Sequence, residues 1–160
     1  MSVLVTPDMA NFSGHFHGGD LLKYLDQVAY ACATRYSGKY CVTLSVDKVL
    51  FKRPIMVGDM VTFLARVNYT GRSSMEIGIK VVAENLTKKT DTHTNSCYFT
   101  MVAIDENGNP TEVPKLELES DDEKRRFKDA QERRNIRLYG CIHHKKDGIP
   151  CGATNVNNCK

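Results

Sequence analysis

One short stretch, residues 17–26 (HGGDLLKYLD), combines residue types that could carry out chemistry. A pair of glycines, Gly18 and Gly19, opens an apolar helix, and a single carboxylate, Asp26, lies two turns inside it. Glycine lets a ligand approach the backbone closely, and the first N–H groups of a helix lack partners within it. Together with the positive end of the helix dipole, these donors suit an oxygen that carries, or is developing, negative charge.

Asp26 falls at the edge of the apolar face of this predicted helix, beside Leu22 and Ala33. At about 100° per residue, the apolar face consists of Leu21, Leu25, Val28, Ala29 and Cys32. A carboxylate half embedded in apolar surface is poorly solvated, which suits a general base or a nucleophile. The spacing alone also allows a solvated aspartate at the rim of a core, and both interpretations stay open at this point.

Composition narrows the class of protein. With 160 residues, 41% of them hydrophobic, the chain is long enough for one compact domain with a core. The formal net charge of +3 is small and no basic run is interleaved with aromatic residues, so we expect no nucleic-acid partner. Residues 1–8 lack a basic n-region and a long apolar stretch, so we expect neither a signal peptide nor a membrane span. We interpret Cys32, Cys41 and Cys97 as small buried residues and expect a cytoplasmic location.

The patterning predicts one long helix followed by strands. The helix covers residues 17–37, and Gly38 is a natural stop. The alternating segments are residues 41–51, 60–70, 74–83 and 92–104, with residues 3–5 as a short first strand. Because turn residues link these strands directly, the pattern predicts an α+β fold in which an antiparallel sheet wraps around one long central helix. It argues against a doubly wound fold.

A charged helix and a tail follow the strands. Ser120 and Glu123 form a capping box for a helix to about residue 138, which we place on the surface as part of a domain covering residues 1–138. Its expected apolar contacts are Phe127, Ala130 and Ile136. The tail, residues 139–160, contains the ligand types of a zinc site in Cys141, His143, His144, Cys151 and Cys159. Their spacing fits no standard zinc pattern, so we predict no metal site.

A combination of short segments resembles the hot-dog fold acyl-CoA thioesterases (acyl-CoA hydrolases). The matching positions are 7–11, 14, 17–19, 26, 42–47, 54, 57–59, 71–77, 97–101, 114 and 121–124. The resemblance therefore covers about residues 6–138, and the combination is specific where a lone Gly-Gly followed by Asp would not be.

The resemblance implies a role for each matching residue. Asp26 corresponds to the catalytic carboxylate, acting as general base on water or as nucleophile, and Asn11 to the asparagine that positions the water or the thioester. The backbone N–H groups at Gly18 and Gly19 would polarise the thioester carbonyl. His17 belongs to the motif and is expected to shape the loop. No metal or separate cofactor is implied, because coenzyme A is part of the substrate.

Binding of the coenzyme A phosphates would need basic and hydroxyl side chains. The candidates are Arg72, Ser73, Ser74, Lys48, Lys52 and Arg53. Each Lys or Arg could equally be a solvated surface charge, and Arg72 ranks first because its whole segment matches the family. The family also implies at least a homodimer, with the site at the joint between two sheets, and commonly a hexamer built as a trimer of dimers.

Two alternatives remain at this stage. Gly14-His15-Phe16 is similar to the start of the motif of 3-hydroxyacyl carrier-protein dehydratases, but His17 stands where that motif has proline. The domain could also be a non-catalytic acyl-CoA-binding regulator, although both Asn11 and Asp26 are present and no DNA-binding segment accompanies them.

Overall fold

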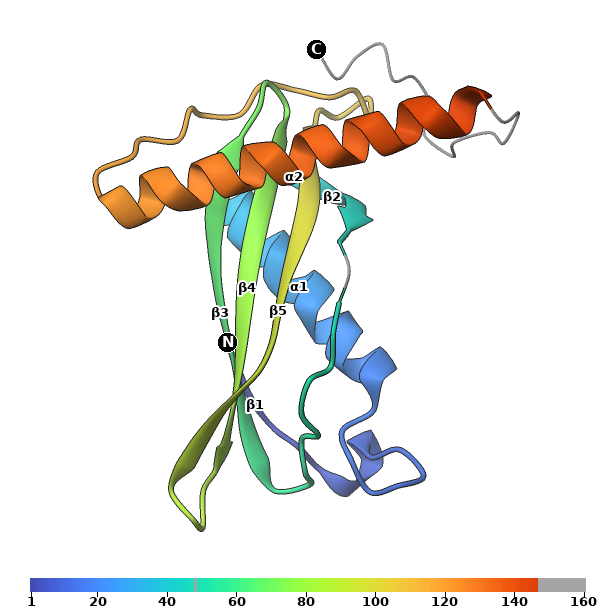
Figure 1. Cartoon of the computed structure of the whole chain (residues 1–160), viewed down its shortest axis with the longest axis vertical. Coiled ribbons are helices and arrows are strands. Elements are labelled where there is room, and N and C mark those ends of the chain that lie inside the picture. Colours follow the sequence, from blue (N-terminus) through green and yellow to red (C-terminus); the bar gives the residue numbers. More distant parts are fainter. Residues whose placement is uncertain (48, 147–160) are drawn as a thin grey trace.

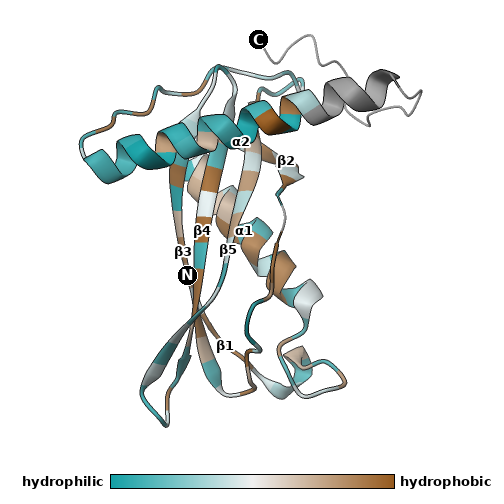
Figure 2. Ribbon diagram, in the orientation of Figure 1, coloured by the Kyte–Doolittle hydropathy of each residue, from teal (hydrophilic) through white to brown (hydrophobic). Residues whose placement is uncertain are grey.

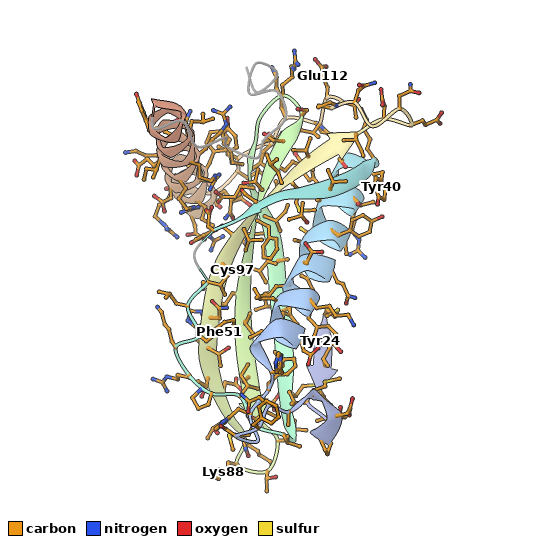
Figure 3. All side chains as sticks on the ribbon, turned by 90° about the vertical axis from the view of Figure 1, so that its right-hand side faces the viewer. Tyr24, Tyr40, Phe51, Lys88, Cys97 and Glu112 are labelled. Atoms are coloured by element: carbon orange, nitrogen blue, oxygen red, sulfur yellow. The ribbon has the colours of Figure 1, made fainter. Side chains whose placement is uncertain are left out.

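The computed structural model describes residues 1–47 and 49–146, the last seven of these by their backbone alone. Five strands form one antiparallel sheet in the order β1-β3-β4-β5-β2. The strands are β1 (Ser2–Leu4), β2 (Tyr40–Val46), β3 (Asp59–Thr70), β4 (Ser74–Asn85) and β5 (Thr90–Ile104). The long helix α1 (Gly18–Ser37) lies against β2, β3, β4 and β5 on one face of the sheet. Helix α2 (Asp121–Lys146) crosses the other face (Figures 1 and 3). A short 3-10 helix, η1 (Pro7–Met9), precedes the loop that leads into α1.

The core lies between α1 and the sheet, and it confirms the predicted α+β hot-dog fold. The helix buries Leu21, Leu25, Val28, Ala29 and Ala33, whereas Cys32 is only half-buried. The predicted alternation of apolar residues along β4 and β5 is confirmed, because the following side chains are buried: Met75, Ile77, Ile79, Val81, Cys97, Phe99, Met101 and Ala103. Gly38 ends α1 in the left-handed conformation, with φ of 67°.

Strand β2 differs from its prediction. The expected strand through residue 51 is wrong, because β2 ends at Val46 and the chain leaves the sheet at Asp47. The register with β5 shifts between Thr43 and Ser45, as at a β-bulge. Leu44 and Val46 are 54% and 43% exposed, and β2 is an edge strand of the sheet that the described residues form.

Helix α2 confirms its predicted start but not all of its predicted contacts. Glu123 N–H donates to Ser120 Oγ at 3.3 Å, and Ser120 N–H donates to Glu123 Oε2 at 2.9 Å, which is the expected capping box. Ala130 is fully buried, but the contact expected of Ile136 is wrong because its side chain is 71% exposed. The helix also extends past residue 138, to Lys146.

Helix α2 is mostly hydrophilic along its length (Figure 2). It packs against the sheet through Phe127, whose ring centroid is 4.9 Å from that of Tyr69. Two arginines provide its other main contacts, as described below. No helix in the described part of the chain is long and apolar enough to cross a membrane.

Candidate active site

The start of α1 is capped by the side chain of His17. Its Nδ1 accepts a hydrogen bond from Gly19 N–H at 3.0 Å, and its backbone oxygen accepts the first helical bond, from Leu21 N–H. The Gly19 N–H is therefore already used within the protein. The N–H groups of Gly18 and Asp20 donate to no protein group in the described residues, so these two donors remain free at the start of the helix.

Aromatic rings of the protein itself lie against the two glycines. A Cβ atom on Gly18 would stand 3.7 Å from the Phe51 ring, and one on Gly19 would stand 3.0 Å from the His17 ring. Phe51 belongs to the segment that leaves β2 and passes the start of α1 (Figure 3). In the single chain, the groups that lie close to the two glycines are therefore the rings of Phe51 and His17. The Phe51 ring borders the free N–H group of Gly18.

Asp26 is held by a residue that sequence reasoning did not single out. Thr43 Oγ1, on β2, donates to Asp26 Oδ1 at 2.6 Å, while the Met101 sulfur lies 3.4 Å from the same hydroxyl. The carboxylate is the stronger acceptor, so the single hydroxyl proton goes to Asp26. Asp26 is exposed in the single chain. The expectation of a carboxylate half embedded in apolar surface is therefore wrong for one chain. The alternation of apolar and polar residues along β2 places Thr43 on its polar side. It does not predict that Thr43 contacts Asp26, because that contact forms only when β2 packs against α1.

Asn11 organises the loop before α1. Its Oδ1 accepts hydrogen bonds from Ser13 N–H at 2.9 Å and from His15 N–H at 3.1 Å, and its own N–H donates to His15 O at 2.7 Å. The amide orientation follows from these donors. The Asn11 Nδ2 group makes no hydrogen bond within the described residues, which leaves it able to donate to a bound ligand.

The residues predicted to bind coenzyme A fall in two separate places. Lys52 and Arg53 are exposed and follow Phe51 directly, near the start of α1. Arg72 and Ser73 lie in the turn between β3 and β4, and Ser74 begins β4, at the opposite end of the sheet from the start of α1 (Figure 1). One chain therefore does not bring the two groups together. Lys48 and the tail residues from position 147 lie outside the described residues, as do the side chains of Cys141, His143 and His144.

Known proteins resemble this chain in sequence and in fold. The thioesterase superfamily matches residues 13–90. Protein VdlD of Helicobacter pylori is 53% identical over 150 residues, which cover 93% of this chain and 86% of that protein. A hexameric acyl-CoA thioesterase, solved in the apo form, is 36% identical with a TM-score of 0.85, covering 88% of this chain and 90% of that one.

An acyl-CoA hydrolase of Staphylococcus aureus, solved with butyryl coenzyme A, coenzyme A and coenzyme A disulfide, is also similar. It is 31% identical with a TM-score of 0.83, covering 92% of this chain and 90% of that one. Alanine variants of an asparagine, an aspartate and a threonine of that hydrolase have been solved as well. The present chain belongs to the thioesterase superfamily, as an enzyme of the hot-dog fold acyl-CoA hydrolase family.

Proposed function

We propose that this protein hydrolyses acyl-CoA thioesters to a free acid and coenzyme A, using Asp26, Asn11 and the start of α1. The observation that carries this proposal is the 2.6 Å hydrogen bond from Thr43 to Asp26, because it fixes a carboxylate that is otherwise free to react. The separate Gly18 N–H donor and the Asn11 amide supply the polarising groups that a thioester hydrolase requires.

The spacing of three residues supports the assignment. In the S. aureus hydrolase, the substituted asparagine precedes the aspartate by 15 positions, and the aspartate precedes the threonine by 17. The same separations, 26 − 11 = 15 and 43 − 26 = 17, relate Asn11, Asp26 and Thr43 here. Two of these residues were predicted from the sequence, and the hydrogen bond independently selects the third.

In the proposed reaction, Asp26 acts in one of two roles, as general base or as nucleophile. As general base, Asp26 takes a proton from water while the water oxygen attacks the thioester carbonyl carbon. The tetrahedral oxyanion accepts a hydrogen bond from Gly18 N–H, the C–S bond then breaks, and the coenzyme A thiolate takes up the proton. As nucleophile, Asp26 instead attacks the carbonyl carbon, the C–S bond breaks and the coenzyme A thiolate leaves, which gives an anhydride. Water then hydrolyses the anhydride to the free acid and regenerates the Asp26 carboxylate, and the thiolate takes up the proton released. Asn11 Nδ2 donates to the water or to the carbonyl oxygen in both routes.

The length of α1 indicates that more than one subunit forms each site. Gly18 and Asp26 are eight residues apart, so at 1.5 Å per residue they are separated by roughly 12 Å along the helix. One thioester cannot contact both groups of the same chain. A homodimer would supply Asp26 from one chain and the Asn11 loop with Gly18 from the other, and the exposed edge strand β2 offers a surface for such pairing. We propose this dimer, assembled further into a trimer of dimers, in a cytoplasmic protein.

The proposed activity is tested by following thiol release from acyl-CoAs of increasing chain length. Asp26→Asn keeps size and polarity, so the rate should fall at least about a hundredfold with folding intact. Asp91→Asn, an exposed aspartate on β5, should keep wild-type activity. A folded Asp26→Asn variant with near-normal turnover would refute the assignment. Tight acyl-CoA binding without thiol release would instead favour the regulator, and loss of water from a 3-hydroxyacyl thioester would favour the dehydratase.

Shared sites are tested by mixing two inactive variants. Asn11→Ala and Asp26→Ala oligomers should each be nearly inactive, but a mixed dimer would contain one site with both residues intact. Random pairing makes half the dimers mixed with one intact site each, so activity should recover to roughly a quarter of wild type. No recovery, with mixed dimers detected by mass spectrometry, would mean that both residues serve one subunit's site.

A further inference from the structure

A buried carboxylate anchors α2 to the outer face of the sheet. Glu76, on β4, is only 2% exposed. Arg133 of α2 donates to its Oε1 at 2.7 Å and to its Oε2 at 3.3 Å, and the same guanidinium lies 3.7 Å above the Tyr98 ring. A charge this buried requires such a partner, because an unpaired carboxylate would be strongly destabilising. Helix α2 therefore binds the sheet through charge pairing as well as through the apolar contacts of Phe127 and Ala130.

Arg137, one turn further along α2, extends this network to the end of β2. Its Nη1 donates to Asp47 Oδ2 at 2.6 Å, and its Nη2 lies 3.5 Å from Glu76 Oε2. The side chains of Arg137 and Asp47 are 24% and 20% exposed, so this ion pair is not an ordinary surface contact. Burial raises the pKa of Asp47, and Arg137 opposes that rise.

Asp47 is the first residue of the segment that reaches the candidate active site. Its N–H donates to Tyr98 O at 2.9 Å, and the next anchor is Lys52 N–H, which donates to Thr94 O at 3.3 Å. In the described part of residues 47–53, these two backbone bonds and the Arg137 pair are the polar anchors. Between them lies Phe51, whose ring borders Gly18. The position of this ring, and of Lys52 beside it, thus depends on how Asp47 is held.

We propose that Arg137 is a positioning residue for substrate binding: through Asp47, it holds the 47–53 segment against the start of α1. This inference rests on the proposed function, since it assumes that acyl-CoA binds beside Phe51, Lys52 and Arg53. A segment held in its bound conformation before the ligand arrives loses less conformational freedom on binding, so its loosening weakens binding. Asp26 and Thr43 pair with each other, and neither of them hydrogen-bonds to Arg137 or Asp47.

The test uses Arg137→Met in the full chain, with Arg125→Met as the matched control. Arg125 also lies on α2 and pairs with Asp122 at 2.6 Å and Asp129 at 3.1 Å, but those pairs stay within the exposed surface of the helix. For Arg137→Met, we expect KM for acyl-CoA to rise about fivefold with kcat within about twofold. Hydrogen exchange of the peptide covering residues 47–57 should become faster. Arg125→Met should change neither property.

Two further variants separate positioning from general stability. Arg137→Lys keeps a cation that can reach Asp47 but not both carboxylates, so its KM should lie between those of Arg137→Met and wild type. It also serves as the test variant if Arg137→Met does not fold. In the Asp47→Asn/Arg137→Met double variant, KM should rise no further than in the more affected single variant, because the two side chains act as one unit.

Each result decides the proposal. Unchanged exchange in the 47–57 peptide, or an unchanged KM, would overturn it. A fall in kcat with unchanged KM, accompanied by a lower Tm, would show a purely structural role and also overturn it. If the wild-type protein releases no thiol from any acyl-CoA, the proposed function fails. The exchange measurement then still decides whether Arg137 holds the segment, because it needs no activity.

Discussion

Replacing Thr43 with valine removes one hydroxyl group while keeping the shape of the side chain. The hydroxyl donates to Asp26 Oδ1 at 2.6 Å, which is short for a hydrogen bond between oxygens, as expected when the acceptor is charged. Bonds of this kind contribute about 1.5–3 kcal/mol. Asp26 is exposed in the single chain, so water replaces part of the lost bond and the lower half of that range applies. A loss of about 1.5–2 kcal/mol corresponds to a rate about 10- to 30-fold lower.

The assay is kcat and kcat/KM for one acyl-CoA substrate. Most of the loss from Thr43→Val should appear in kcat, because the hydroxyl orients the carboxylate that we propose reacts. Thr43→Ser restores the donor and should recover most of the activity. Thr62→Val is the matched control, since Thr62 Oγ1 shares a 3.0 Å hydrogen bond with Ser2 at the exposed edge between β1 and β3.

Two results would refute this reasoning. If Thr43→Val keeps wild-type kcat, the bond to Asp26 does not support the reaction. If Thr43→Ser is as slow as Thr43→Val, the methyl group and its packing matter, and the hydroxyl does not.

Three other changes test separate parts of the structure. Glu76→Gln leaves Arg133 without its charged partner and should lower the free energy of unfolding by about 2–3 kcal/mol in urea titrations; adding Arg133→Met should restore part of the loss, and an unchanged midpoint would contradict the buried pair. Burial raises the pKa of Cys97 to about 12, so at pH 8 about one thiol in ten thousand is ionised. Iodoacetamide should therefore modify Cys97 only after denaturation, and rapid labelling of the native protein, detected by peptide mass spectrometry, would contradict its burial. Arg72→Ala should raise KM about threefold, and less at high salt, if Arg72 binds a substrate phosphate; a KM equal to wild type would leave it as a solvated surface charge.

The core was predictable because its signals are local. Alternation along β4 assigns Met75 and Ile77 to the side facing α1, and the structure buries both. The same period places Glu76 on the opposite side, which is also correct. A period of two shows which side a residue faces, but not what covers that side. Glu76 is buried because α2 returns over it from far along the chain, and no pattern near residue 76 predicts that.

The start of α1 was predictable because one motif contains it. Residue types and spacing predict the helix start at His17-Gly18-Gly19. The partner of Asp26, Thr43, lies on another element, 17 positions away. Thr43 looked like one of several polar residues on a strand, because the contact between β2 and α1 exists only once the sheet has curled around the helix. The surface position of α2 was predicted correctly, but its ion pairs with the sheet were missed for the same reason, since Arg137 pairs with Asp47 across 90 positions.

We expect the orientation of the reacting groups and the exclusion of water to depend on different parts of this protein. Within one chain, Thr43 holds Asp26, His17 caps the helix start and the Asn11 oxygen orders its loop, so the groups that we propose react are oriented. Asp26 nevertheless stays exposed to water, where electrostatic stabilisation of a developing oxyanion is weak. On the strand that carries Thr43, exposed Leu44 and Val46 leave apolar surface and an unpaired sheet edge that favour association. Covering that edge with a second copy would exclude water next to Thr43 and Asp26. We therefore expect assembly and activity to depend on the same surface.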